Sequence, residues 1–186
     1  MPLRRFTPPE NGKILAIYDY VGEHNRLLYQ IVRFAPKIFR YRRSGESGEW
    51  IWDLDGVELI LFHLPDVIKS ETVLVLEGEK DVCTAYKLGL PDGWAATSCA
   101  MGAGQWRSRY SEILRGKRVI ICPDTDVPGQ RHLRQVSLDL VGKAADIRKL
   151  TLPNGVKDLT EWAESGGTSS QFTTLLDTSA IFDLPY

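Results

Sequence analysis

The 186-residue sequence lacks the features that would place it in several common protein classes. It has only three cysteines, Cys83, Cys99 and Cys122, and no Cys-x-x-Cys pair, which argues against a zinc site or a disulfide framework. No apolar run approaches the roughly 20 residues that a membrane-spanning helix needs. The first residues contain no apolar signal-peptide core, so we expect a cytoplasmic protein with no membrane partner.

An excess of charge of either sign is also absent. Lysine and arginine number 23 and aspartate and glutamate 24, which gives a formal net charge of -1. A protein that coats nucleic acid by bulk positive charge is therefore not expected, although a local basic surface is compatible with this balance. Hydrophobic residues make up 43% of the chain, enough to bury a core in one or two small domains.

Residues 1–69 have the pattern of a small antiparallel β meander. Apolar and aromatic residues alternate with variable positions around 14–20, 27–31 and 39–41. Turn signals separate these stretches, and Trp50 and Trp52 have the period-two spacing of a further strand. We therefore predict a first domain over residues 1–69.

From residue 70 the pattern changes to alternating strands and helices. Short apolar runs at 73–76, 94–98, 119–122 and 145–150 predict buried strands, and helical periodicity follows the first three. A short helix is predicted over 158–164, and another after Thr168, which forms a capping box with Gln171. Repeated strand–helix units predict an α/β domain over 70–186, with a parallel sheet of about four strands flanked by helices.

Acidic residues follow two of the predicted strands. Glu77 comes directly after the first apolar run, and Asp124 and Asp126 come just after the third. In open α/β sheets, ligands bind at the carboxyl ends of strands. Carboxylates gathered there repel one another unless a hard cation lies between them, and oxygen ligands suit Mg2+ or Mn2+. Such a cation would support phosphoryl transfer. The alternative is that these are solvated carboxylates at loop edges.

In these motifs the sequence resembles the TOPRIM family, whose pattern is a Glu at the end of the first strand and an Asp-x-Asp at the end of the third. Glu77, Asp124 and Asp126 match that pattern in type, order and strand context. The segment Glu-Gly-Glu-Lys-Asp at 77–81 is similar to the first motif of DNA primases and primase-helicases of phages and plasmids. The resemblance implies a TOPRIM-type fold in which these three residues are catalytic and hold the metal.

Two further acidic residues enter through the same resemblance. Asp81 ends the first motif, and Asp158 lies in a Lys-Asp segment before a short helix that is followed by Gly166-Gly167. Both match additional acidic positions of the primase metal site, so the implied ligands include Asp81 and Asp158. Thr160 departs from the pattern, since bacterial primases usually carry another Asp there, and a second metal site would be incomplete.

The resemblance implies a primase-type nucleotidyltransferase core that makes RNA primers on single-stranded DNA from ribonucleoside triphosphates, with Mg2+ or Mn2+ as cofactor. A TOPRIM nuclease would use the same cluster to cleave nucleic acid. A non-catalytic nucleic-acid-binding module would neither synthesise primers nor cleave nucleic acid. Both alternatives stay open. A zinc-binding domain or a helicase, which primases of this kind carry, would come from another chain or from a larger protein that contains this core.

Basic residues lie among aromatic ones in the first domain. They could bind single strands through phosphate contacts and base stacking, or they could guard a solvated edge strand. Lys80 could contact a phosphate or pair with Glu79, whereas Arg131, His132 and Arg134 fit a solvated helix face better than a phosphate site. The candidate nucleic-acid-contacting residues are Arg33, Lys37, Arg40, Arg42, Arg43 and Lys80.

Overall fold

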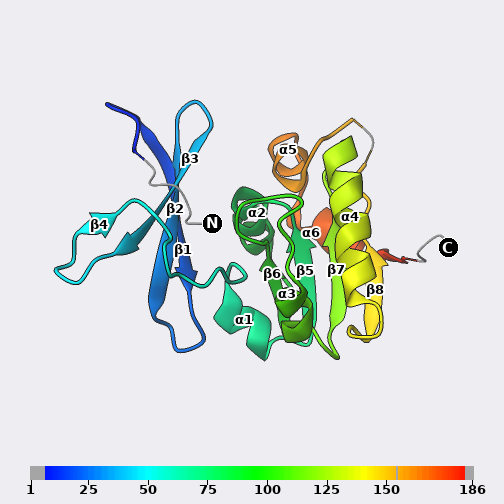
Figure 1. The fold of residues 1–186 in the computed structure, drawn as a ribbon. Coiled ribbons are helices and arrows are strands. Elements are labelled where there is room, and N and C mark those ends of the chain that lie inside the picture. The colour runs from blue at the N-terminus through cyan, green and yellow to red at the C-terminus, as the bar shows by residue number, and fades with distance from the viewer. Residues whose placement is uncertain (1–6, 154, 183–186) are drawn as a thin grey trace. The chain divides into compact units, whose positions relative to one another are not determined.

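The computed structural model describes residues 7–153 and 155–182. The chain divides into two compact units, Met1–Pro65 and Asp66–Tyr186. Figure 1 colours the first unit in blue and cyan and the second from green to red. Within the described residues, no helix is long and apolar enough to cross a membrane.

The first unit contains a four-stranded antiparallel sheet in the order β1-β2-β3-β4, which confirms the predicted meander. Because alternate residues of a strand point to the same face, one face gathers Tyr18, Tyr20, Tyr29 and Ile31, which are all buried. The Tyr20 and Tyr29 rings stack with their centroids 4.5 Å apart. The strands are β1 (Ile14–Val21), β2 (Leu27–Phe34), β3 (Ile38–Ser44) and β4 (Trp50–Ile51).

The segment that follows β4 completes the core of this unit. Phe62 packs against Tyr18 and Tyr20, and the Tyr29 hydroxyl accepts a hydrogen bond from the backbone N–H of Ile60 at 3.2 Å. A short helix, α1 (Leu64–Lys69), comes next. The sequence predicted only a boundary there, although Pro65 suits the first turn of a helix, where its missing N–H costs nothing.

The second unit contains a five-stranded sheet in the order β6-β5-β7-β8-β9. Four strands are parallel, as predicted, and β9 (Ala180–Ile181) adds an antiparallel edge that is too short to give a sequence pattern. The parallel strands are β5 (Thr72–Leu76), β6 (Trp94–Thr97), β7 (Arg118–Cys122) and β8 (Asp146–Lys149).

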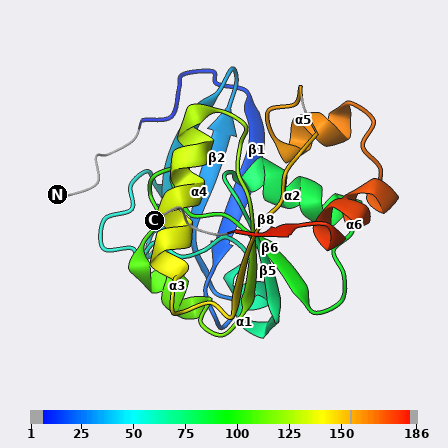
Figure 2. The same cartoon turned by 90° about the vertical axis from the view of Figure 1, so that its right-hand side faces the viewer.

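Helices cover both faces of this sheet. Figure 2 shows α3 and α4 on one face and α2, α5 and α6 on the other. The helices are α2 (Glu79–Leu88), α3 (Ser108–Ile113), α4 (Val127–Leu140), α5 (Leu159–Glu164) and α6 (Ser169–Asp177), and α6 begins with the predicted capping box of Thr168 and Gln171.

The register of the two central strands positions the acidic residues. β5 and β7 are neighbours, and Leu76 at the end of β5 lies beside Cys122 at the end of β7. Both strands are apolar and almost fully buried, so neither can shift in register without exposing its core residues. The residues that follow the two strands therefore emerge at one edge of the sheet.

Candidate metal centre

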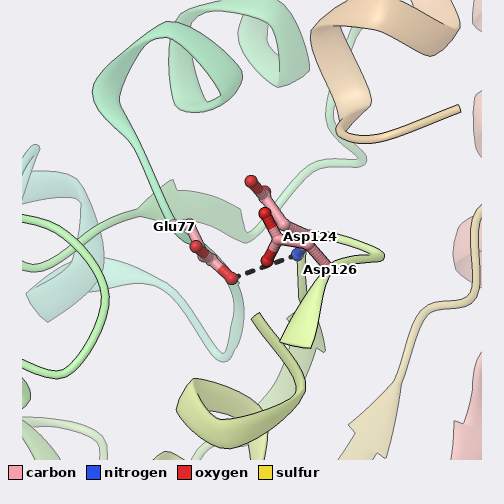
Figure 3. A group of neighbouring side chains, drawn as sticks. All are labelled: Glu77, Asp124 and Asp126. Atoms are coloured by element: carbon pink, nitrogen blue, oxygen red, sulfur yellow. Dashed lines mark hydrogen bonds between the residues drawn. The ribbon is translucent and has the colours of Figure 1, made fainter. Parts of the chain in front are cut away.

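Three carboxylates meet at this edge. Glu77, Asp124 and Asp126 each offer one oxygen, and the three oxygens all lie within 4.8 Å of one another. Figure 3 shows Glu77 reaching from the end of β5 toward the loop after β7, where the backbone N–H of Asp124 donates to Glu77 Oε1 at 3.2 Å. We call Glu77, Asp124 and Asp126 the acidic triad.

The start of α4 holds the loop in this shape. Asp126 caps the helix, since its Oδ1 accepts a hydrogen bond from the N–H of Gly129 at 2.9 Å. Only glycine fits at position 129 without a steric clash, because a Cβ there would overlap the carbonyl oxygen of Asp124 and lie 2.5 Å from Glu77 Oε1. Gly129 is not recognisable as a site residue from the sequence, because a helical glycine carries no signal of what lies against it.

Burial and mutual repulsion set the charge state of the triad. Burial, followed by the negative charge of Asp124, raises the pKa of Glu77 to about 7. Burial also raises the pKa of Asp124, against the opposing hydrogen bond from Lys157. These carboxyl groups lose a proton more readily when a cation is bound beside them.

Lys157 belongs to the site although it was not among the predicted site residues. Its Nζ lies 2.7 Å from Asp124 Oδ2 and 3.6 Å from Asp126 Oδ2, and the bond to Asp124 raises the pKa of Lys157. The backbone N–H of Thr125 donates to the Lys157 carbonyl at 2.9 Å, which ties the two loops together. When all groups are ionised, three carboxylates against one ammonium leave a net negative charge that a divalent cation would neutralise.

The structure places Asp81 and Asp158 outside this cluster. Asp81 is 9% exposed, and its Oδ1 accepts hydrogen bonds from the Thr160 N–H at 3.0 Å and the Thr160 hydroxyl at 2.6 Å. Asp158 caps α5 by accepting from the N–H of Glu161 at 2.8 Å. Within the described residues, both carboxylates thus have structural partners, and a role in a second metal site stays a prediction.

The basic residues of the first unit divide between the two faces of its sheet. In the pairing of β2 with β3, Arg40 lies opposite Val32 and Arg42 opposite Gln30, which puts both arginines on one face. Arg33 lies opposite Phe39 and therefore points to the other face, together with Arg43. The set predicted from the sequence is therefore not one continuous surface.

Arg42 has the surroundings of a stacking site. Its guanidinium lies 4.1 Å from the ring centroid of Trp50 and 5.3 Å from that of Trp52, and its Nε donates to Gln30 Oε1 at 2.7 Å. Arg43 instead pairs with Asp53 at 2.9 Å. Arg40 Nε donates to the carbonyl of Thr7 at 2.9 Å.

The remaining basic candidates lie at the surface. Lys37 is exposed, and Lys80 pairs with Glu164 at 2.8 Å. On α4, Arg131 and Arg134 are exposed as predicted.

The prediction of a solvated face was wrong for His132, which is 1% exposed. His132 Nδ1 accepts a hydrogen bond from the N–H of Gly104 at 3.2 Å, and burial lowers its pKa to about 4.

No family model and no curated protein matches the sequence. Solved structures of primases do match the fold. The bacteriophage T7 primase domains, in a complex of the lagging-strand DNA polymerase with an RNA/DNA hybrid and dTTP, align with a TM-score of 0.67 and 20% identity over 89% of this chain and 78% of theirs. The zinc-binding and RNA polymerase domains of the Aquifex aeolicus primase give a TM-score of 0.68 and 16% identity over 89% of this chain and 40% of that one.

A DNA primase domain from Pseudomonas aeruginosa is similar as well, with a TM-score of 0.60 and 19% identity over 89% of this chain. This chain spans 51% of that domain, so it corresponds to part of the bacterial proteins. The chain has the fold of primase catalytic cores, in which an antiparallel sheet precedes a mostly parallel sheet with helices. The resemblance to TOPRIM-containing primases is thus confirmed at the level of the fold.

Proposed function

We propose that this chain is a primase-type nucleotidyltransferase core that makes RNA primers on single-stranded DNA, with Mg2+ or Mn2+ held by Glu77, Asp124 and Asp126. One observation carries the proposal: the acidic triad converges at the carboxyl ends of β5 and β7 in a chain with the fold of primase cores.

The acidic triad suits a hard divalent cation. All its donors are carboxylate oxygens, three of them within 4.8 Å of one another, and Lys157 offsets only part of their charge. When bound, the cation would neutralise the phosphates of an incoming nucleotide and stabilise the charge that develops during phosphoryl transfer.

The chain's own residues have separate tasks in this proposal. Asp124 and Asp126 hold the cation, and Asp126 also keeps the loop in place through its cap on α4. Glu77 completes the ligand set, and binding of the cation favours the ionised form of this carboxyl, whose pKa is about 7 in the metal-free protein. Lys157 balances the two aspartates and lies where it can contact a phosphate.

The first unit would supply the contact with the template. Arg40 and Arg42 share one face of its sheet, and the exposed Trp50 ring lies against Arg42, so that phosphate contact and base stacking are available together. Lys80 could add a phosphate contact, since its ion pair with Glu164 is exposed and contributes little stability. A zinc-binding domain or a helicase would act beside this core, as the Aquifex aeolicus primase structure includes a zinc-binding domain.

Primer synthesis tests the proposal. The protein is incubated with single-stranded DNA, ribonucleotides and Mg2+ or Mn2+, and in parallel without nucleotides. We expect short oligonucleotides only when nucleotides are present, and none from Glu77→Gln, which keeps the size of the side chain and removes its charge. Glu164→Gln is the matched control, since the Glu164 side chain is 67% exposed.

The other outcomes identify the rival functions. Cleavage of the DNA without nucleotides, abolished by Glu77→Gln, would replace the primase by a TOPRIM nuclease. Binding of single strands with neither reaction, even after a zinc-binding domain from a related primase is added in trans, would leave a nucleic-acid-binding module.

A further inference from the structure

The Lys157 ammonium lies among several carboxylates of the candidate metal centre. Its Nζ is 2.7 Å from Asp124 Oδ2 and 3.6 Å from Asp126 Oδ2, and the negative charge of Asp158 also favours the charged form of this ammonium. One positive group therefore neutralises carboxylates that otherwise repel one another. A divalent cation bound at the same oxygens would have the same neighbours.

The backbone around Lys157 is fixed from two sides, although its side chain is half exposed. On the side of β7, the Thr125 N–H donates to the Lys157 carbonyl at 2.9 Å, and the Thr125 hydroxyl donates to the Val156 carbonyl at 2.9 Å. On the side of α5, the Lys157 N–H donates to Glu161 Oε2 at 2.5 Å, so the Glu161 carboxylate is engaged by the backbone. Lys157 is therefore held in place beside the two aspartates.

The same segment continues into α5, where Thr160 engages Asp81. Asp81 Oδ1 accepts hydrogen bonds from the Thr160 N–H at 3.0 Å and from the Thr160 hydroxyl at 2.6 Å, and that hydroxyl lies 3.0 Å from the hydroxyl of Thr84. The oxygen that Asp81 would offer to a second cation thus has two donors already. At position 160, where the resemblance to bacterial primases implies another acidic ligand, the chain has a hydrogen-bond donor.

We propose that the Lys157 ammonium takes the place of a second divalent cation, so that the centre binds a single Mg2+ or Mn2+ ion at the acidic triad. This inference rests on the proposed function and fixes how many ions its metal centre holds. The charges of the triad agree with it, because three ionised carboxylates, one ammonium and one divalent cation leave no net charge. A lysine is charged at neutral pH whatever the concentration of Mg2+, so this part of the centre needs no ion from solution.

Removal of the Lys157 charge should therefore open a second cation site. The freed Oδ2 atoms of Asp124 and Asp126, together with the Asp158 carboxylate, would offer oxygen ligands to a second ion. Asp158 can take part because its cap on α5 uses only Oδ1, which accepts from the Glu161 N–H.

Titration of the full chain with Mn2+, without nucleotide or nucleic acid, tests the proposal. The electron paramagnetic resonance signal of free Mn2+ gives the number of ions bound per chain. We expect one ion in the wild type, two in Lys157→Met, which keeps most of the side-chain length without its charge, and one in Lys157→Arg. Ions bound by Asp124→Asn/Asp126→Asn measure binding elsewhere on the surface and are subtracted.

Lys149→Met is the matched control. Lys149 Nζ donates to Gln130 Oε1 at 3.4 Å, and Gln130 Nε2 donates to the Asp124 carbonyl at 3.1 Å, so this lysine reaches the same loop through an amide and not through the carboxylates. We expect Lys149→Met to bind one ion, as the wild type does.

Several results would overturn the proposal. Two ions in the wild type would show that Lys157 replaces none, and one ion in Lys157→Met, bound more tightly, would show that Lys157 only competes with a single cation. A second ion in Lys149→Met would show that any loss of positive charge nearby has this effect. Thermal unfolding of each variant checks the fold, and the neutral Lys157→Gln carries the test if Lys157→Met does not fold.

Failure of the proposed function gives a different pattern of results. A chain that makes no primers but binds one Mn2+, and two after Lys157→Met, keeps the inference. A chain that makes primers and binds two Mn2+ ions as the wild type loses the inference alone. A wild type that binds no Mn2+ loses both.

Discussion

Glu77→Gln should stabilise the metal-free protein at alkaline pH, although it removes a residue of the proposed active site. The cost of burying an ionised Glu77 beside Asp124 raises the pKa of this carboxyl from 4.5 to about 7. Glutamine has the same size and its Oε1 can still accept the hydrogen bond from the Asp124 N–H, but it carries no charge to bury.

The size of the effect follows from proton linkage. Between pH 4.5 and about 7 the folded protein keeps a proton on Glu77 that the unfolded chain has released, so the wild type loses stability as pH rises through this window. Each unit of pKa shift corresponds to about 1.4 kcal/mol, so a shift from 4.5 to about 7 sets an upper bound of about 3.5 kcal/mol. Because Glu77 is only half-buried and water screens it, we expect about 1.5 kcal/mol at pH 8 and little difference at pH 5.

Urea unfolding of both proteins in the presence of EDTA at pH 5 and pH 8 measures this difference. Glu164→Gln, an exposed carboxylate in α5 with an exposed partner, should be nearly neutral at both pH values. Added Mn2+ should stabilise the wild type far more than Glu77→Gln, because only the wild type has the full ligand set. A variant that is less stable than the wild type at pH 8, or a stability difference independent of pH, would show that an ionised Glu77 does not destabilise the metal-free fold.

Three further predictions concern the neighbouring residues and the template face. Asp124→Asn/Asp126→Asn should weaken Mn2+ binding in titrations by about tenfold or more while keeping or raising metal-free stability, since asparagine still caps α4; equal Mn2+ binding would remove the claimed role. Gly129→Ala should cost about 1–3 kcal/mol in urea unfolding because its Cβ meets the Asp124 carbonyl, and wild-type stability would contradict the close packing. Replacing Arg40 and Arg42 by glutamine should reduce the slope of log affinity against log salt concentration, for single-stranded DNA, by about 0.7 per lost phosphate contact. An unchanged slope would mean that both arginines are solvated and do not contact phosphates.

The acidic triad could be predicted from the sequence because its convergence depends on the topology of the sheet alone. Buried parallel strands are recognisable from short apolar runs, and their carboxyl ends meet at one edge whatever the details of packing. Glu77, Asp124 and Asp126 come directly after such strands, so their convergence needed no knowledge of side-chain contacts.

The missed features depend on contacts between distant segments. Lys157 reaches Asp124 across 33 residues of sequence, and its partner is set by how the loop before α5 folds back. His132 follows the charged Arg131, but it is buried, and the N–H of Gly104, 28 residues earlier in the sequence, donates to its ring. Alternation within β3 already separates Arg43 from Arg40 and Arg42. The face of Arg33 depends on the register of β2 with β3, which the sequence pattern of one strand cannot define.

Anomalous scattering of Mn2+ in crystals of the wild-type protein tests the metal centre directly. We expect one anomalous peak between the carboxylates of Glu77, Asp124 and Asp126, and loss of that peak in Glu77→Gln or in Asp124→Asn/Asp126→Asn. A well-ordered triad without a peak at millimolar Mn2+, or a peak held by Asp81 and Asp158 instead, would contradict it.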